Sequence, residues 1–197
     1  KEQCPGLPDW KALAACAPIF ATPETAPKGR YLGGMATWGG HDEERVRSLG
    51  LNFVVKHAQT DEELYRELQA AYDARRPIVL WVFAPHWVQT LFEGEWVRFP
   101  PYTEACYRSG RYDCAKPAGP IWKAAWSGLE KAWPSAARAL RKFRIDNDEM
   151  SRLIAAVGLG GRGGGEGGDA WVATNEGRGR GGGGGGGAPA GVQIEAQ

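Results

Sequence analysis

Residues 51–83 read LNFVVKHAQTDEELYRELQAAYDARRPIVLWVF, and this stretch decides the fold. Its first seven residues are rich in β-branched side chains, as in a strand. Thr60 and Glu63 then have the spacing of a helix capping box, and apolar side chains follow at the helical period. The helix is expected to end before Pro77, because a residue that precedes proline avoids the helical region. The run at 78–83 is apolar and short, as in a fully buried strand.

The sequence before this stretch adds another strand and another helix. A short strand is expected at residues 30–34 and a helix at residues 42–49. The resulting order, strand-helix-strand-helix-strand with short connections, predicts an α/β fold built on a parallel sheet. Ligands of such sheets bind in the loops at the carboxyl ends of the strands. Farther along, the patterns predict an edge strand at 95–99, helices at 121–131 and 134–143, and a helix capped by residues 146–148.

Glycine is distributed unevenly along the 197 residues. Eighteen of the 29 glycines lie from Gly158 onward, and seven of them are consecutive at 181–187. Such a segment loses much backbone entropy on folding and has little apolar surface to compensate. We therefore predict a folded part over residues 1–157 and a glycine-rich, low-complexity tail over residues 158–197. Within the tail, residues 169–176 have a helix-compatible composition and a buriable tryptophan.

Composition excludes several classes of protein. The formal net charge is only +1, which removes the broad basic surface expected of a nucleic-acid-binding protein. No run approaches the roughly 20 consecutive apolar residues of a membrane helix. The chain starts at Lys1 without an apolar run behind a basic start, so no secretory signal is recognised. We find no motif for a metal or a cofactor and expect neither.

Four cysteines form two close pairs in the sequence, Cys4 with Cys16 and Cys106 with Cys114. Neither pair has the two-residue spacing of a zinc knuckle, and the three histidines lie elsewhere. Disulfides within these pairs would close short loops and stabilise the fold by roughly 2–3 kcal/mol each. The alternative is four reduced, buried cysteines in a cytosolic protein. We favour the two disulfides, which indicate an oxidising compartment.

No pattern typical of an enzyme active site is present. The sequence lacks a nucleophile elbow, a phosphate-binding loop, a zinc-protease helix and a calcium-binding loop. His41, His57 and His86 are isolated from one another, and a single histidine is more often structural than catalytic. The acidic residues at 42–44 are interpreted as the solvated first turn of a helix. We therefore assign no catalytic residue.

The loop after the first strand combines an aromatic side chain with two glycines. Trp38 lies between the strand at 30–34 and the helix at 42–49, and Gly39 and Gly40 follow it directly. Glycines leave backbone N–H groups accessible at the amino end of that helix, where the helix dipole favours an anion such as a carboxylate. This loop is therefore a candidate anion site with a tryptophan beside it.

A second loop of this kind contains Phe83 and Trp87, at the carboxyl end of the strand at 78–83. Aromatic faces hold a quaternary ammonium by cation–π attraction, worth about 0.5–2 kcal/mol per face. If the two loops adjoin, they suit a ligand with a methylated ammonium at one end and a carboxylate at the other, such as a betaine. For each aromatic residue taken singly, core packing is the alternative. Trp81 is expected to point into the core.

Several ordered blocks resemble the glycine betaine/choline/proline-type substrate-binding proteins of ABC transporters, from Cys4 to about Val157. The blocks are CPGLPDW at 4–10, ATPETAPKGR at 21–30, the Trp38-Gly39 loop, PIVL at 77–80, APHW at 84–87, YDCAKP at 112–117 and WKAAWSG at 122–128. The resemblance implies a two-lobed periplasmic-binding fold of type II, present in part, with most of lobe two and part of lobe one. It also implies a chain that begins partway through the family's domain.

The same resemblance implies a function without catalysis. Members of the family are solute-binding components of ABC importers, and they deliver a quaternary amine such as glycine betaine or choline to a permease in the membrane. The expected location is the periplasm, or more generally the extracytoplasmic side of the membrane, and the expected state is a monomer. Two alternatives remain open: an aromatic-rich protein-interaction module without a small-molecule ligand, and an α/β enzyme that uses His86 or His41 as a base.

The resemblance also assigns ligand contacts. In the family, the tryptophan of the first loop lines an aromatic cage and the two amides after it bind the carboxylate, which transfers to Trp38, Gly39 and Gly40. The second motif usually reads Trp-x-Pro-x-Trp, whereas residues 83–87 read FAPHW. Phe83 therefore stands in place of a tryptophan, and phenylalanine attracts a cation more weakly.

Overall fold

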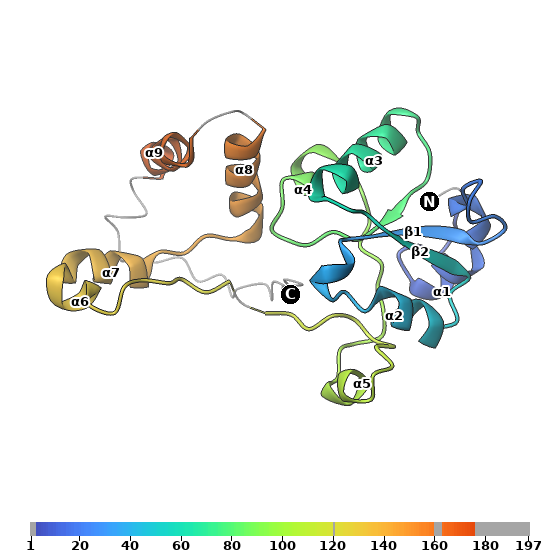
Figure 1. Cartoon of the computed structure of the whole chain (residues 1–197). Coiled ribbons are helices and arrows are strands. Elements are labelled where there is room, and N and C mark those ends of the chain that lie inside the picture. The colour runs from blue at the N-terminus through green and yellow to red at the C-terminus, as the bar shows by residue number, and fades with distance from the viewer. Residues whose placement is uncertain (1–2, 120, 160–162, 176–197) are drawn as a thin grey trace. The chain divides into compact units, whose positions relative to one another are not determined.

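The computed structural model describes residues 3–119, 121–159 and 163–175. It divides into two compact units (Figure 1). The first unit contains residues 3–82 and 94–117, and the second contains residues 83–93 and the described residues from 118 onward. A division into two units agrees with the two-lobed fold that the sequence predicts.

The first unit is built on a parallel three-stranded sheet. Its strands are β1 (Gly29–Gly33), β2 (Phe53–His57) and β3 (Val79–Leu80), in the order β2-β1-β3. β1 pairs in parallel with both neighbours. The predicted α/β fold with a parallel sheet is thus confirmed. The strand expected at 78–83 is shorter than predicted, and the edge strand expected at 95–99 is reduced to one isolated bridge between Asp9 and Arg98.

Helix α3 (Asp61–Asp73) joins β2 to β3 and is the helix predicted behind Thr60. The Thr60 hydroxyl accepts a hydrogen bond from the Glu63 amide at 3.1 Å, as at a helix N-cap. The helix buries Leu64, Tyr65, Leu68 and Ala71, whereas Tyr72, four residues after Leu68, is exposed. The remaining helical segments of this unit are α1 (Trp10–Ala15), η1 (Ala17–Phe20), η2 (Ala36–Trp38), α2 (Asp42–Ser48) and α5 (Glu104–Arg108).

The order of the strands determines where the loops of this sheet lie. From β1 the chain crosses through α2 to β2, and from β2 it passes back over β1 through α3 to β3. Right-handed crossovers in opposite directions place their helices on opposite faces, and Figure 1 shows α3 on one side of the sheet and α1 and α2 on the other. The connections therefore change direction at β1. In open α/β sheets, ligands bind outside the carboxyl ends of the strands at such a reversal.

The main hydrophobic core lies between the sheet and the segments that contain α1 and η1. Leu13, Ala17 and Phe20 pack there with Leu51, Phe53 and Val79. The rings of Phe20 and Phe53 have centroids 5.9 Å apart. Burial of this continuous apolar cluster stabilises the sheet and so holds the carboxyl ends of its strands in place.

Both predicted cysteine pairs are disulfides in the structure, Cys4–Cys16 and Cys106–Cys114. The first connects the residues before α1 to those after it, and the second connects Cys106 within α5 to Cys114 in the segment that follows. Both lie in the first unit, and none of the four cysteines is free.

The second unit is helical in the part of the chain that the structure describes. Its helices are α4 (Val88–Leu91), α6 (Leu129–Ala132), α7 (Pro134–Lys142), α8 (Asn147–Gly158) and α9 (Gly164–Thr174). The predicted helices behind Pro134 and Asp146 are confirmed, and Asp146 forms a complete capping box with Glu149. Among all described residues, no helix is long and apolar enough to cross a membrane.

The helix predicted at 121–131 is wrong over most of its length. Helix α6 starts only at Leu129. Trp122 and Trp126, whose spacing of four would place them on one face of the predicted helix, are 83% and 64% exposed. An amphipathic helix gains most of its stability from burial of its apolar face. Those two rings have no such cover in the described chain, so helical periodicity alone does not form the helix.

The predicted tail at 158–197 lies partly outside the described residues, namely at 160–162 and 176–197. In its described part, α8 ends at Gly158 and α9 includes most of the segment at 169–176. The Trp171 ring of α9 contacts Phe143 edge to face, with centroids 5.5 Å apart. The division of the chain at residue 157 stays a prediction.

We expect thiol titration of the denatured, unreduced protein to find no free thiol. Replacing Cys4 and Cys16 together by alanine should lower the free energy of unfolding by roughly 2–3 kcal/mol, because the unfolded chain loses a closed loop. The Cys106→Ala/Cys114→Ala variant should cost a similar amount, since the two loops have sequence separations of 12 and 8. Denaturant unfolding measures both, and four titratable thiols would contradict the pairing.

Candidate functional site

Trp38 lies in the loop after β1 and packs against Trp81, the residue that follows β3. Their ring centroids are 4.8 Å apart and the rings are tilted by 49°. Trp81 is buried, as expected, and it supports the half-buried Trp38 ring. A Cβ atom on Gly34 would lie 2.5 Å from Trp38 Cε3 and 3.0 Å from Trp81 Cε3. The absence of a side chain at Gly34 therefore allows the ring pair to sit against the end of β1.

Gly39 and Gly40 continue this loop into α2. Gly39 has a positive φ of 65°, and its amide already donates to the Ala36 carbonyl at 3.3 Å. The described residues provide no hydrogen-bond acceptor for the Gly40 amide. A Cβ atom on Gly40 would lie 2.8 Å from Asp42 Oδ2, so a carboxylate occupies the space of a side chain there. Of the two predicted amides, Gly40 is the one left for a ligand.

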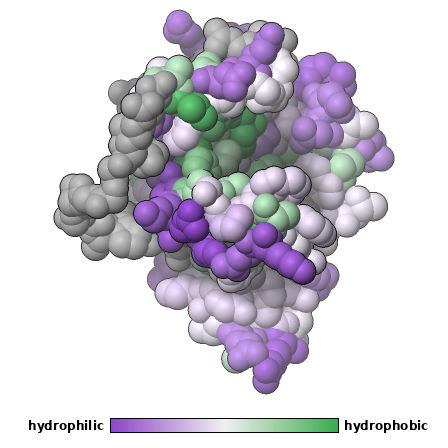
Figure 2. Space-filling model, turned by 90° about the vertical axis from the view of Figure 1, so that its left-hand side faces the viewer, coloured by the Kyte–Doolittle hydropathy of each residue, from purple (hydrophilic) through white to green (hydrophobic). Residues whose placement is uncertain are grey.

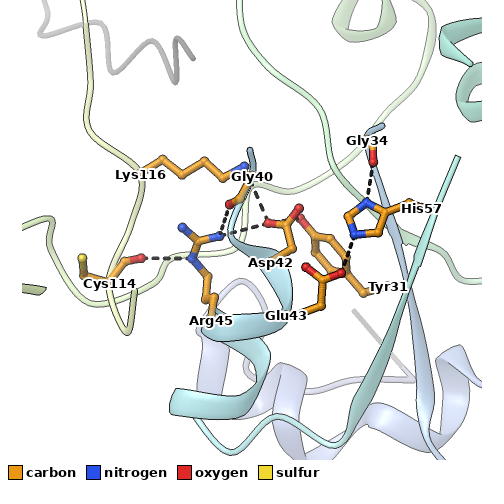
Figure 3. Close-up of polar contacts among 9 residues, drawn as sticks. All are labelled: Tyr31, Gly34, Gly40, Asp42, Glu43, Arg45, His57, Cys114 and Lys116. Carbon is orange, nitrogen blue, oxygen red and sulfur yellow. Dashed lines mark hydrogen bonds and ion pairs between the residues drawn. The ribbon is translucent and has the colours of Figure 1, made fainter. Parts of the chain in front are cut away.

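Asp42 corrects our interpretation of residues 42–44 as a solvated turn, because its carboxylate is only 3% exposed (Figure 3). Asp42 Oδ1 accepts hydrogen bonds from Arg45 Nη1 at 3.0 Å and from the Tyr31 hydroxyl at 3.2 Å. Lys116 Nζ lies 3.6 Å from the same oxygen. A buried carboxylate requires such partners to offset the loss of its hydration.

Arg45 connects the Trp38 loop, which is the segment 34–41 between β1 and α2, to the second disulfide loop, which is the segment 106–114. Its Nε donates to the Cys114 carbonyl at 3.0 Å, and its Nη1 is 3.4 Å from the Gly40 carbonyl (Figure 3). The side chain is 5% exposed. The guanidinium thus holds two segments 69 residues apart in the sequence at fixed positions beside Gly40.

A second ion pair lies at the end of β2. His57 Nε2 is 2.5 Å from Glu43 Oε1, and His57 Nδ1 is 2.6 Å from the Gly34 carbonyl. Burial favours the neutral ring, but the hydrogen bonds to Gly34 and Glu43 outweigh it and raise the pKa of His57. Burial raises the pKa of Glu43, but the hydrogen bond with His57 outweighs this effect, so the pKa of Glu43 is lowered. The His57 ring thus links Glu43 to the turn at Gly34.

Aromatic rings of the second disulfide loop flank the other end of the Trp38 loop. The His41 ring stacks on Tyr112, with centroids 3.8 Å apart and planes within 5°. Tyr107 meets Tyr112 edge to face, with centroids 4.9 Å apart. His41 is thereby engaged in packing at the start of α2, which gives no support to its use as a catalytic base.

The predicted residues Phe83 and Trp87 lie in the second unit, on either side of His86. The Phe83 ring meets His86 with centroids 4.9 Å apart, and the Trp87 ring lies 5.3 Å from His86. Trp87 precedes α4 directly and has a further contact with Phe92 at 6.3 Å. Both predicted aromatics are half-buried, so each retains exposed ring surface.

A chain of hydrogen bonds attaches this segment to α8. The side-chain Nε2 of Gln89 donates to the Phe83 carbonyl at 3.1 Å, and the Ser151 hydroxyl donates to Gln89 Oε1 at 3.3 Å. The His86 amide donates to Ser151 Oγ at 3.1 Å. Burial lowers the pKa of His86 to about 4, so the ring is neutral near pH 7. His86 and Ser151 meet through the backbone amide, which is not the geometry of a base and a nucleophile.

The five predicted contacts are therefore divided over the two units, with Trp38, Gly39 and Gly40 on the first and Phe83 and Trp87 on the second. The family described as the substrate-binding domain of the ABC-type glycine betaine transport system, OpuAC, matches residues 1–174. The chain belongs to the OpuAC family. The type II periplasmic-binding fold expected from the sequence is thus established for this OpuAC domain.

A relative in Pelagibacter ubique is named a trimethylamine N-oxide-binding protein. It is 33% identical to this OpuAC domain in an alignment of 186 residues that covers 89% of this chain and 58% of the relative. The chain thus spans somewhat more than half of the relative's length.

The residues behind the Trp38 loop of this OpuAC domain escaped prediction. Asp42, Arg45 and Lys116 resemble ordinary surface residues in the sequence. Asp42 and Arg45 are three residues apart on α2, and the packing of a distant segment brings Lys116 to them. One signal was available: Lys116 belongs to the YDCAKP block that carries the family resemblance.

Gly34→Ala is expected to displace the Trp38 ring, because the added Cβ cannot share space with Trp38 and Trp81. We expect a loss of about 1–3 kcal/mol in the free energy of unfolding and an altered near-ultraviolet circular dichroism spectrum. Gly94→Ala in the same unit is the control, since nothing lies within 4 Å of its Cβ position. Equal spectra for both variants would contradict the close packing of this ring pair.

His86 is expected to make stability fall with acid. Its folded pKa of about 4 lies below the usual 6.5, so the unfolded chain binds the proton better between these values. Stability should be intact above about pH 6.5 and fall as the pH is lowered toward 4, by at most about 3 kcal/mol. His86→Asn, which cannot titrate, should flatten this decline in pH-dependent denaturation curves, whereas His41→Asn should preserve it. An unchanged decline in His86→Asn would refute the assignment.

Proposed function

We propose that this OpuAC-family protein is the solute-binding component of an ABC importer for a small methylated amine. The observation that carries the proposal is the Trp38–Trp81 pair beside the Gly40 amide, where the connections of the sheet change direction. That position suits a ligand, as the reversal of a parallel sheet generally does. Membership of a substrate-binding family supports binding and transport over catalysis.

We assign the methylated nitrogen to the aromatic residues. Trp38 would face it from the first unit, and Phe83 and Trp87 from the second. The packing of Trp38 on Trp81 and the hydrogen-bonded attachment of Phe83 to Gln89 support pre-organised rings. Rigid rings reduce the entropy lost on binding.

We assign the anionic end of the ligand to the backbone amides of Gly39 and Gly40. Gly40 would be the main hydrogen-bond donor, because the Gly39 amide already donates to the Ala36 carbonyl. Glycine betaine carries a carboxylate, and trimethylamine N-oxide, for which the Pelagibacter relative is named, carries an oxygen directly on the methylated nitrogen. Both unite a methylated nitrogen with an anionic oxygen. We propose a ligand of this kind for the present protein.

The remaining parts of the proposal concern place and partners. An ABC permease in the membrane would receive the ligand, and the protein would act as a monomer on the extracytoplasmic side, in the periplasm. The two disulfides support an oxidising compartment.

One observation favours the alternative of a protein-interaction module. Trp122, Trp126 and Trp133 are 83%, 64% and 61% exposed in the second unit. Other residues, of high hydropathy, are also seen exposed among hydrophilic ones in Figure 2. Exposed apolar surface of this kind marks binding surfaces in many proteins. The alternative predicts indifference to small amines.

Tryptophan fluorescence and calorimetry with glycine betaine, choline, carnitine and trimethylamine N-oxide test the proposal. We expect a saturable response to at least one of them. Trp38→Ala and Trp87→Ala should each weaken it by roughly three- to thirtyfold, as expected for one cation–π face. Trp122→Ala is the control, since its exposed ring lies outside the proposed contacts. No saturable response to any of the four compounds would count against the proposal.

Phe83→Trp is expected to raise the affinity for the bound amine by a few-fold. Tryptophan attracts a cation more strongly than phenylalanine does, and the larger ring restores the motif usual in the family. Calorimetry measures the change. A matched Phe92→Trp variant, which alters the neighbour of Trp87 and none of the proposed contacts, should leave the affinity nearly constant.

A further inference from the structure

Lys116 brings a positive charge to the Trp38 loop. Its side chain is 14% exposed, and its Nζ lies 5.2 Å from the centroid of the Trp81 ring. A Cβ atom built on Gly40 would stand 3.4 Å from the same nitrogen. The ammonium is therefore a direct neighbour both of the residue that offers a backbone amide and of the ring that supports Trp38.

Two cations and one buried carboxylate lie next to each other at this loop. Asp42 is the carboxylate that faces two cations, Arg45 and Lys116, while Glu43 is paired with His57 (Figure 3). Within the described part of the chain, Arg45 Nη2 is buried without a hydrogen-bond partner. Arg45 and Lys116 thus both bring a positive charge close to Gly40.

We infer that Lys116 determines the class of ligand, selecting methylated amines that carry an anionic oxygen over methylated ammonium ions that carry none. The inference rests on the proposed function and concerns the same site. The ammonium would attract the carboxylate of a betaine or the oxygen of an N-oxide at the Gly40 amide, and would repel choline, whose charge is purely positive. The aromatic faces cannot make this distinction, because all these ligands present the same methyl groups to them.

A purely structural role of Lys116 makes a different prediction. If the ammonium served only to neutralise Asp42, its loss would loosen the Trp38 loop and weaken every ligand to a similar degree. Selectivity between ligands therefore separates the two roles, whereas affinity for a single ligand does not.

The test compares dissociation constants for glycine betaine, trimethylamine N-oxide and choline, measured by calorimetry on the 197-residue protein. We expect the unmodified chain to bind choline at least tenfold more weakly than the better of the other two. Lys116→Met should weaken glycine betaine and the N-oxide by roughly tenfold or more and leave choline unchanged or tighter. Lys116→Arg, which retains the charge, should preserve the preference.

Lys56→Met is the matched control, because Lys56 lies in the same unit but pairs with Glu24, at 3.9 Å. It removes one positive charge and should not change the ratio of the dissociation constants. If glycine betaine binds and Lys116→Met weakens all three ligands equally, or leaves the ratio as it was, the role of Lys116 is overturned while the proposed function stands. If the unmodified protein binds none of the three, both fail.

Discussion

The candidate site depends on the contacts of one buried group, the guanidinium of Arg45. It bonds to the Cys114 carbonyl, contacts the Gly40 carbonyl and pairs with Asp42, and all three partners come from segments that lack regular structure or only begin a helix. A buried cation is tolerated only if its partners stay in place, because leaving it unpaired costs several kcal/mol. The loop with Trp38 and the end of the disulfide loop, two residues before Lys116, are therefore held by the same charge.

Much of the fold follows from local chemistry, which is why the sequence predicts it. Thr60 caps α3 and Asp146 caps α8 through their own side chains, so a few adjacent residues are enough to place both helix starts. The short apolar runs become parallel strands because the helices between them are long enough to cross back over the sheet. Once the strands are placed, the loop at Trp38 is a candidate site by its position alone.

The parts that escaped prediction depend on contacts between distant segments. Asp42 has the sequence context of a solvated first turn, yet it is buried, and one of the cations that pair with it, Lys116, comes from far along the chain. Conversely, residues 121–128 have helical periodicity, but no described segment covers Trp122 and Trp126, and the helix starts only at Leu129. Periodicity states which residues would be buried together. Burial itself is decided by a neighbour that the local sequence does not contain.

Trp81 contacts both groups that the proposed recognition of a methylated zwitterion uses, an aromatic ring and a cation. Its ring supports Trp38, and the Lys116 ammonium lies over it, so one core side chain sets the position of an aromatic face and of a charge. Aromatic faces supply affinity for methyl groups common to betaines, N-oxides and choline alike. A group that discriminates among these ligands must act on the part in which they differ, which is the oxygen. In the proposed site, the aromatic residues noticed in the sequence would therefore account for binding, and selectivity would come from the charges behind them, which the fold brings together.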